Sequence, residues 1–551
     1  MNVLQGTGVS GGIAAGPLYV YCHNRQKIEK RSISDIHAEQ QLFERARCTA
    51  VQQLEEIRQK DNNSAELLLA HQMMLEDADF IDSVNDIIEK EHVCAVYAVS
   101  ETGKKFAKLF VDMDDSYMQA RAADVNDAAA RVIACLTGTG SRLHIDTPVL
   151  LAADDLAPSE TVQLDRTKIL GFVTSGGAPQ GHTAILARTM GIPAVIGVGA
   201  VHWEDIQGTF AVMDGDTGEV VIEPDAQTRG QMEARQKQQR TERQQAEHMR
   251  GKETVTADGK KIMLYCNIGS PADIDAVLAN DGGGIGLFRS EFLYLEREDY
   301  PTEQQLFEAY REAAQRMDGK RVIIRTLDIG ADKQAAYFGL QKEENPAMGL
   351  RAVRLCLTRP EICRTQLRAL YRASAYGSIA ILFPMIASVW EVQEMKRMCE
   401  EVKQDLDAEH IGYDASTELG IMIETPAAVM LADRLAREVD FFSIGTNDLT
   451  QYTLAADRQN EQLGRFFDAH HPAVLRMIHR VAEQAHKAGI WVGICGELAA
   501  DRTLTETFLA LGIDELSVSP TQVLPLRAAI RAVHSAAHRE TILHDLMCET
   551  E

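Results

Sequence analysis

The chain has no apolar run of the about 18–20 residues that a membrane-spanning helix needs. Its first residues carry neither the basic start nor the apolar stretch of a signal peptide, and its 10 cysteines include no CxxC pair. Scattered cysteines of this kind are typical of a reducing compartment. We therefore expect a cytoplasmic protein and exclude a membrane-spanning or disulfide-stapled secreted one.

Basic residues are also in short supply. The chain has 56 Lys and Arg against 81 Asp and Glu, so its formal net charge is −25. Such a surface repels phosphate backbones, which argues against nucleic-acid binding. An anionic substrate would need a local basic pocket, and clustered arginines therefore become informative.

Several common motifs are absent or incomplete. No GxxxxGK[ST] segment exists, and the GxGxxG match at 6–11 leads to Pro17 instead of a helix. His534 and His538 have the spacing of a helical metal pair, but no Glu follows His534 as HExxH requires. His470-His471 has no evident ligand partners. We expect no P-loop, dinucleotide or HExxH zinc site.

Proline is missing from 33–136, where apolar residues recur at helical spacing and predict a subdomain of about four helices. Strand-like segments precede this stretch, near 17–21, and follow it. The helices therefore look inserted into an α/β domain. A polar stretch at 225–252 then predicts a solvated linker helix. The strand-like segments after the helices lie at 149–152, 169–173, 193–197 and 220–222.

After the linker, short β-rich runs alternate with long amphipathic helices, which predicts a (β/α)8 barrel of the TIM type. In such a barrel the chemistry lies at the carboxyl ends of the strands. The predicted strands lie near 262–267, 284–289, 321–328, 379–386, 419–424, 440–446, 490–495 and 514–518.

Arg289 and Arg325 lie at the ends of the second and third barrel strands. A buried Arg is costly unless it meets an anion, and its fork matches phosphate oxygens, so the pair indicates a phosphate clamp. The alternative is that each pairs with a carboxylate such as Glu291 or Asp328. Further cations on later loops enlarge the cluster: Lys333, Arg351 and Arg458.

Glu424 ends the predicted strand near 419–424, and Asp448 follows the predicted strand near 440–446. Two carboxylates at one barrel mouth suit Mg²⁺, which completes its shell with water and substrate oxygens. The alternatives are a helix N-cap for Asp448 and a salt bridge for Glu424.

Cys495 and His182 each allow a functional and a structural interpretation. Cys495, between two glycines at the end of the predicted strand near 490–495, is either inert core or a proton donor. His182 follows a Gly-rich turn at the start of a predicted helix, where it is either a phosphoryl acceptor or a surface histidine.

With these residues in place, the chain resembles the phosphoenolpyruvate–protein phosphotransferases, the enzyme I family of the bacterial sugar phosphotransferase system. The resemblance covers nearly the whole length. Its motifs lie at 155–161, 182 with 192–195, 286–293, 325–330, 440–449 and 493–498.

The resemblance implies an α/β multidomain architecture with a homodimer formed through the barrel. It implies a swivelling phosphohistidine α/β domain at 1–24 and 145–224, a helical phosphocarrier-binding subdomain at 25–144, a linker helix at 225–252 and a phosphoenolpyruvate-binding barrel at 253–551.

It also implies roles for individual residues. Phosphoenolpyruvate would pass its phosphoryl group to His182 and then to a histidine-containing phosphocarrier protein, while Cys495 protonates the enolate. The phosphate would be held by Arg289, Arg325 and Arg458, with Arg351 and Asn447 nearby and Mg²⁺ on Glu424 and Asp448. The supporting residues would be Thr161 beside the acceptor histidine, Lys333, and Arg121 toward the carrier.

One segment departs from the family. Pro179-Gln180-Gly181 stands before His182, where the family usually has Arg-Thr-Ser/Thr. That change removes a charge and two hydroxyls, so the transfer rate or the choice of carrier is expected to differ. Two alternatives stay open. One is a pyruvate–phosphate dikinase or phosphoenolpyruvate synthase, for whose ATP-grasp domain the chain has no room. The other is a non-catalytic phosphoenolpyruvate sensor.

Overall fold

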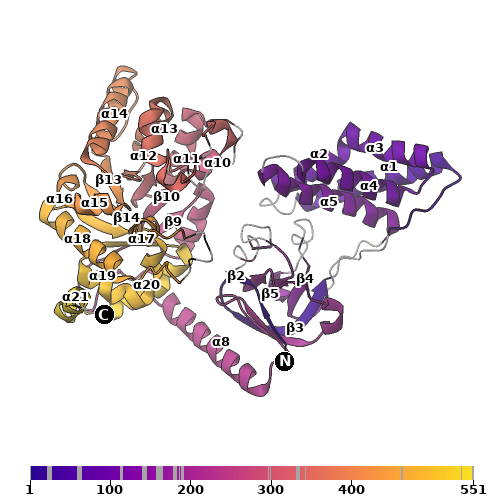
Figure 1. The fold of residues 1–551 in the computed structure, drawn as a ribbon, viewed down its shortest axis with the longest axis horizontal. Helices are drawn as coiled ribbons and strands as arrows, with labels where there is room; N and C mark the ends of the chain where they lie inside the picture. Colours follow the sequence, from indigo (N-terminus) through magenta and orange to yellow (C-terminus); the bar gives the residue numbers. More distant parts are fainter. Residues whose placement is uncertain are drawn as a thin grey trace. The chain divides into compact units, whose positions relative to one another are not determined.

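The chain forms two compact units, Met1–Thr241 and Glu242–Glu551, which we call the first and second unit (Figure 1). No helix in the described ranges is long and apolar enough to cross a membrane. The computed structural model describes residues 2–21, 28–58, 65–111, 116–138, 145–154, 156, 166–177, 183–184, 187, 191–295, 297, 299–330, 335–341, 343–458, 460, 463, 465–534 and 537–548.

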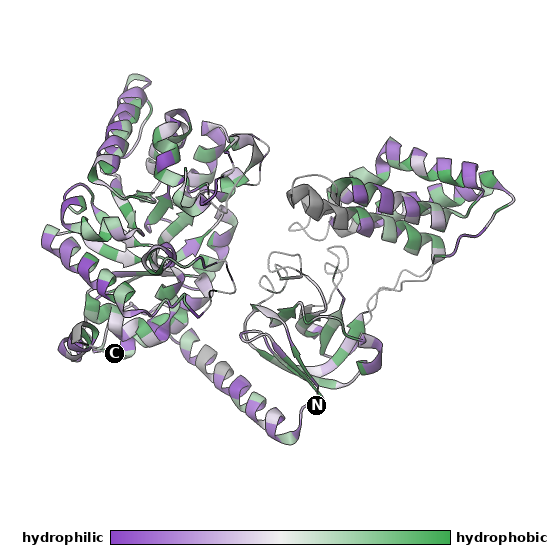
Figure 2. Cartoon of the chain, in the orientation of Figure 1, coloured by the Kyte–Doolittle hydropathy of each residue, from purple (hydrophilic) through white to green (hydrophobic). Residues whose placement is uncertain are grey.

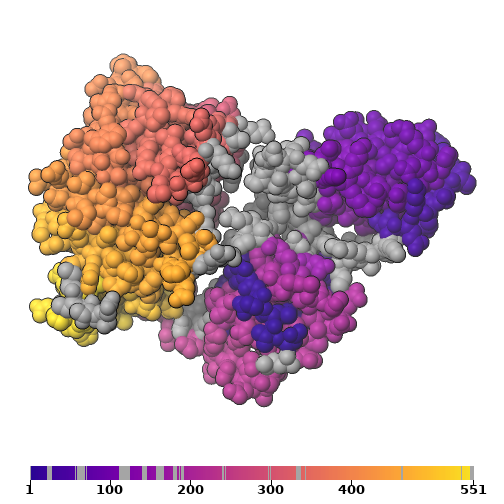
Figure 3. Space-filling model, viewed as in Figure 1, coloured from indigo at the N-terminus to yellow at the C-terminus, as the bar shows by residue number. Residues whose placement is uncertain are grey.

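The first unit contains an 8-stranded mixed sheet in the order β1-β8-β7-β3-β4-β5-β6-β2. The N-terminal strands, indigo in Figure 3, lie among later residues coloured magenta, as the pairing of β1 with β8 and of β2 with β6 requires. The five expected strands are confirmed as β3, β4, β5, β6 and β8, and β1, β2 and β7 are additional. The bounds are β1 Asn2–Gln5, β2 Thr7–Ser10, β3 Ile13–Tyr21, β4 Val149–Ala153, β5 Ile169–Thr174, β6 Ala194–Ile196, β7 Phe210–Asp214 and β8 Glu219–Ile222.

A helical bundle is inserted between β3 and β4, which pair in parallel. Its core contains Phe43, Leu54, Phe80 and Ile88, each at most 1% exposed. The described residues of the bundle form five helices, whereas the sequence predicted about four. Asp77 separates two of them, because it ends one apolar run and caps the next helix. The helices are α1 Ile36–Arg58, α2 Ala65–Glu76, α3 Ala78–Glu91, α4 Ala95–Val111 and α5 Ser116–Thr137.

Helix α8, Ala226–Glu247, is the predicted polar helix. Its first half is nevertheless anchored to the first unit. Met232 is buried against Ile13 and Val212, and Gln236 donates a hydrogen bond to the Ile13 carbonyl at 2.9 Å. Arg235 also pairs with the buried Asp214 at 3.0 Å. Few apolar residues are thus enough to fix this half, because they combine with directional polar contacts.

The second unit is the predicted closed parallel barrel, in the order β10-β11-β12-β13-β14-β15-β16-β9. Residues facing the surrounding helices form the largest core cluster, while Leu287, Leu382 and Phe441 help to fill the interior. Figure 2 shows the strands largely green and the outer helix faces largely purple. The strands are β9 Met263–Ile268, β10 Ile285–Arg289, β11 Val322–Arg325, β12 Ile379–Phe383, β13 Glu418–Ile423, β14 Phe441–Ile444, β15 Trp491–Ile494 and β16 Glu515–Val518.

Helices follow most barrel strands, and the loops between strand and helix gather at the carboxyl end of the barrel. The helices are α9 Ile274–Ala279, α10 Phe292–Leu295, α11 Glu303–Arg316, α12 Ala352–Thr358, α13 Pro360–Ser374, α14 Val389–Ala408, α15 Pro426–Met430, α16 Ala432–Leu435, α17 Thr446–Leu454, α18 Pro472–Ala488, α19 Thr505–Leu511, α20 Val523–Ala532 and α21 Arg539–Cys548.

Candidate active site

Two arginines end neighbouring barrel strands. Arg289 is the last residue of β10 and Arg325 the last of β11, and their Cα atoms are register partners. Arg289 makes no side-chain hydrogen bond or ion pair with any residue in the described ranges. Burial, and then the neighbouring Arg325, lower the pKa of Arg289. A poorly solvated cation beside a second cation favours an anionic ligand.

Arg325 is only 5% exposed and has two acidic partners. It forms an ion pair with Glu291 and one with Asp328 at 3.1 Å. Although burial opposes its charge, Glu291 and Asp328 raise the pKa of Arg325. Pairing with a carboxylate, the alternative to a phosphate clamp, is therefore present at Arg325 and absent, among the described residues, at Arg289.

Arg351 adds a third buried cation, 4% exposed, at the N-cap of α12. It pairs with Asp328 at 2.9 Å and with Asp448 at 3.7 Å, and it donates to the Tyr452 hydroxyl at 3.2 Å. The Nε atoms of Arg325 and Arg351 are buried without a hydrogen-bond partner in the described residues. The cluster thus keeps donor capacity beyond its internal ion pairs.

Glu424 and Asp448 follow the adjacent strands β13 and β14, as predicted. Glu424 follows β13 and is 2% exposed, and its Oε1 accepts a hydrogen bond from the Met385 backbone at 2.5 Å. Burial, together with Asp448 and Asp328, raises the pKa of Glu424 to about 8. Asp448 lies in the first turn of α17, whose N-cap position is Gly445, so Asp448 is not the capping residue.

These two carboxylates fit a divalent cation. No group of three or more His, Cys, Asp or Glu side chains able to hold a metal occurs in the described part of the chain. Mg²⁺ needs only one or two protein carboxylates, because substrate oxygens and water supply its other ligands. A cation would also relieve the repulsion that keeps the pKa of Glu424 high.

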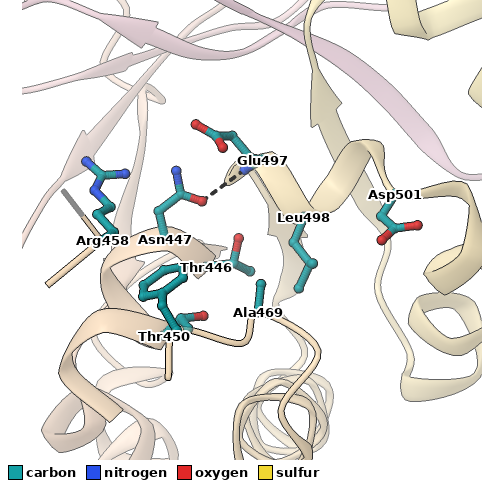
Figure 4. Close-up of a pocket in the computed structure, with 9 residues that line it drawn as sticks. Thr446, Asn447, Thr450, Arg458, Ala469, Glu497, Leu498 and Asp501 are labelled. Carbon is teal, nitrogen blue, oxygen red and sulfur yellow. Dashed lines mark hydrogen bonds between the residues drawn. The ribbon is translucent and has the colours of Figure 1, made fainter. Parts of the chain in front are cut away.

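A pocket of about 620 Å³ is lined by residues of α17 and of the loop after β15 (Figure 4). It includes Asn447, Arg458 and Glu497. The Asn447 Oδ1 accepts a hydrogen bond from the Glu497 backbone N–H at 3.2 Å, drawn as the dashed line. Arg458 is exposed at the rim, so its side chain is accessible to a ligand that enters the pocket.

Cys495 follows β15 and faces the barrel interior with Leu382 and Met422. It is 2% exposed, and burial raises its pKa to about 12. The thiol is therefore protonated at neutral pH, which both readings of this residue allow. A buried S–H can donate a proton but is a poor nucleophile.

The remaining site predictions fall largely outside the described residues. Thr161, His182, Lys333 and the segment 179–181 lie outside them. Arg121 falls within α5, but its side chain is outside the description.

Protein groups contact three of the histidines that lack a complete metal motif in the sequence. His470 contacts Asp501 at 2.7 Å, and His538 contacts Glu506 at 2.8 Å. The His471 ring accepts a hydrogen bond from the Ala473 N–H and so caps α18. Each of these three rings therefore has a protein partner.

Sequence reasoning missed two residues that support the site, Tyr452 and Gln366. Tyr452 lies one helical turn after Asp448 on α17, a spacing that could have indicated it. Gln366 contacts the loops after β10 and β11 from α13, and nothing in the local pattern of that amphipathic helix distinguishes it.

Three family models match the chain: "PEP-utilising enzyme, N-terminal" at residues 5–121, "PEP-utilising enzyme, mobile domain" at 145–218 and "PEP-utilising enzyme, PEP-binding domain" at 243–535. A protein of Priestia megaterium named phosphoenolpyruvate-protein phosphotransferase is 42% identical over 98% of this chain and 96% of its own length. The protein of the same name from Bacillus subtilis (strain 168) is 42% identical over 96% and 94%. A solved structure of an "Enzyme I (nEIt) protein" is 30% identical, with a TM-score of 0.38, over 43% of this chain and 99% of that one.

Proposed function

The chain belongs to the phosphoenolpyruvate-protein phosphotransferase family, and from that premise we propose that it transfers the phosphoryl group of phosphoenolpyruvate to its own His182, releasing pyruvate. His182 then passes the group to a histidine of a small phosphocarrier protein, as the first step of a sugar phosphotransferase system. The protein is thus a transferase with two half-reactions.

The observation that carries this proposal is the cationic cluster at the barrel mouth. Arg289 lacks an ion-pair partner among the described residues, while Arg325 and Arg351 are buried and retain free Nε donors. Phosphoryl transfer asks a protein mainly to position the groups and to stabilise charge on the equatorial oxygens. Arg289, Arg325 and Arg458 hold the phosphate in this proposal, and Arg351 and Asn447 lie beside the rest of the substrate.

Glu424 and Asp448 hold a divalent cation, which we propose is Mg²⁺. When bound, the cation would supply positive charge that stabilises the negative charge on the substrate oxygens. The two carboxylates themselves repel each other, and a bound cation would offset this repulsion and favour the ionised form of Glu424.

In the first half-reaction a ring nitrogen of His182 forms the N–P bond as the bridging O–P bond of phosphoenolpyruvate breaks. The electron pair of that bond leaves with the enolate of pyruvate. Cys495 gives its S–H proton to the terminal carbon of the enolate and becomes a thiolate, which later regains a proton from solvent. Thr161 contacts the acceptor ring, and Lys333 adds positive charge near the mouth.

The domain boundaries and partners are part of the same proposal. His182 lies in the segment matched by the "mobile domain" model, which supports a swivelling domain at 1–24 and 145–224. The phosphocarrier docks on the helical subdomain at 25–144, with Arg121 as a contact. The helix at 225–252 links these parts to the barrel at 253–551, through which the protein forms a homodimer.

The experiment is incubation of the purified chain with phosphoenolpyruvate labelled on phosphorus, in the presence of Mg²⁺. Wild type and His182→Ala are compared for acid-labile, base-stable protein-bound label and for release of pyruvate. We expect label and stoichiometric pyruvate from the wild type alone. EDTA should abolish both, and Mg²⁺ should restore them.

Arg289→Ala serves as a companion variant, because it keeps His182 but removes a cation of the clamp. It should label at least about tenfold more slowly at low phosphoenolpyruvate concentration. Label on His182→Ala equal to that on the wild type would exclude His182 as the acceptor. Pyruvate without any labelled protein would exclude the phosphotransferase mechanism.

A further inference from the structure

A fully buried amide lies beneath the loops that carry the phosphate clamp. Gln366 of α13 is 0% exposed. Its Oε1 accepts a hydrogen bond from the Leu327 backbone N–H at 2.9 Å, directly after the end of β11. Its Nε2 donates to the Ser290 hydroxyl at 2.8 Å and to the Tyr310 hydroxyl at 3.0 Å. One side chain thus contacts the residues that follow Arg289 and Arg325.

Ser290 closes a second link between the same two loops. Its hydroxyl donates to the main-chain carbonyl of Arg325 at 2.5 Å, and the side chain is 0% exposed. Gln366, Ser290 and the backbone from 325 to 327 therefore form one continuous hydrogen-bonded bracket. Because backbone N–H groups only donate, Oε1 must face Leu327, which fixes the orientation of the amide.

The clamp needs such a bracket because its two arginines repel each other. Arg289 and Arg325 end paired strands side by side, and Arg325 contributes to the lowered pKa of Arg289. Before the phosphate arrives, this repulsion, which Glu291 offsets in part, therefore favours a wider separation of the two loop ends. A buried network with satisfied partners resists that movement, and a site held in its binding geometry loses less free energy on binding.

We propose that Gln366 is a positioning residue that holds Arg289 and Arg325 at the separation required to grip the phosphate of phosphoenolpyruvate. The inference rests on the proposed function, since it assumes that the two arginines bind that phosphate. Gln366 itself does not touch the substrate. It acts through Ser290 and the backbone of Leu327.

Gln366→Met tests this role, because methionine has a similar length, cannot donate to Ser290 or Tyr310, and offers the Leu327 N–H only a weak sulfur acceptor. The matched control is Ser374→Ala on the same helix. Ser374 is 4% exposed, donates to the Tyr371 carbonyl at 2.6 Å and accepts from the Asp414 N–H at 2.9 Å. Both substitutions remove buried hydrogen bonds of α13, but only Gln366 contacts the loops of the clamp.

Steady-state transfer to the carrier separates positioning from simple damage. If the bracket presets the clamp, Gln366→Met raises the KM for phosphoenolpyruvate about tenfold and leaves kcat within about twofold. Ser374→Ala should change neither constant. A purely structural role would instead lower the active fraction, so that kcat falls while KM is unchanged, and that result would overturn the proposal.

Direct binding of phosphoenolpyruvate, measured by calorimetry in the full chain with His182→Ala as the common background, removes turnover from the comparison. We expect the Gln366→Met form to bind about tenfold more weakly. Ser290→Ala removes fewer side-chain atoms from the bracket and should weaken phosphoenolpyruvate binding by a smaller factor. This variant keeps the proposal testable if Gln366→Met does not fold. Equal affinities for all forms would refute the bracket, whereas no binding even by the His182→Ala parent would refute the proposed function.

Discussion

Glu424 and Cys495 both depend on burial, but burial has opposite consequences for their proposed roles. Burial raises the pKa of Cys495 to about 12, which keeps the thiol in the form that a proton donor needs. The same effect raises the pKa of Glu424 to about 8, which opposes the ionised form that a metal ligand needs. A bound cation would offset the free energy needed to ionise the buried Glu424 carboxyl. The cation and the proton therefore compete for this carboxylate.

Glu424 therefore predicts a pH dependence for the metal-free protein. Its pKa is about 8 when folded and about 4.3 when unfolded, so between these values the folded state holds a proton that the unfolded state has lost. Stability should fall as pH rises through this range, by up to about 1.4 kcal/mol per pH unit, and level off above pH 8. Glu424→Gln should remove this contribution.

Thermal unfolding in EDTA at pH 6, 7 and 8 measures the effect for wild type and Glu424→Gln. Glu308→Gln on the exposed face of α11 is the control for the change of charge. The wild type and the control should lose stability over this range, and Glu424→Gln should lose less. Parallel losses in all three proteins would show that Glu424 is already ionised at pH 6.

At the scale of elements, a single residue divides the apolar pattern of the helical bundle. Asp77 has an extended backbone and caps α3, accepting hydrogen bonds from the N–H groups of Asp79 at 2.8 Å and Phe80 at 3.3 Å. Without these bonds, two donors at the start of α3 would depend on solvent alone. The boundary between α2 and α3 is thus fixed by a side chain and not by a loop.

Asp77→Ala should destabilise the first unit by about 0.5–2 kcal/mol, which is the usual cost of removing a helix cap. Asp77→Asn keeps an accepting oxygen and should restore most of the loss. Chemical unfolding of the full chain, with helical signal as the probe, measures both variants. Phosphoenolpyruvate binding should not change, and an Asn variant as unstable as the Ala variant would disprove the capping role.

The sequence was sufficient to predict all the barrel strands, because short β-rich runs alternate with amphipathic helices along this part of the chain. The ends of those strands also gave Arg289, Arg325, Glu424, Asp448 and Cys495, since parallel strands present their following residues at one mouth. The sequence named Glu291 and Asp328 as possible partners, but it could not predict which arginine would pair with them. Arg325 pairing with both Glu291 and Asp328 depends on how neighbouring strands are registered.

The sequence also could not predict contacts between elements that lie far apart along the chain. Strand β7, Phe210–Asp214, was not predicted, and its place in the sheet follows from its pairing with β3 and β8. Gln366 was missed because a polar residue on an amphipathic helix normally faces solvent, and only the packed barrel shows that this one faces inward. Such residues are defined by tertiary neighbours and not by their own segment.

At the scale of the whole molecule, α8 is tied at both ends but to different units. Met232 and Gln236 fix its first half to the first unit. After its last turn, the Gly251 N–H donates to Asp281 at 2.8 Å, and the buried Arg527 donates to the Met249 carbonyl at 3.0 Å within the second unit. Any swivel of the proposed kind must therefore pass through the middle of α8 or begin inside the first unit.

Thr241→Pro tests whether the middle of α8 matters for transfer. Thr241 lies between the two anchored ends, and its hydroxyl donates to the Lys237 carbonyl within the helix. Proline at this position removes a helical N–H donor and clashes with that carbonyl, which kinks or breaks the helix. Transfer from phosphoenolpyruvate to His182 should then slow by about tenfold or more, because misplaced reactants lose the benefit of orientation.

The second half-reaction provides the internal comparison, because in our proposal it uses only the first unit. Exchange of label between His182 and a phosphorylated carrier should stay within about twofold of wild type in Thr241→Pro. Thr241→Ala keeps the helical backbone and should leave both half-reactions unchanged. An equal loss of both half-reactions in the proline variant would mean that the first unit itself is damaged, while no loss in either would show that an intact α8 is not needed to bring His182 to the clamp.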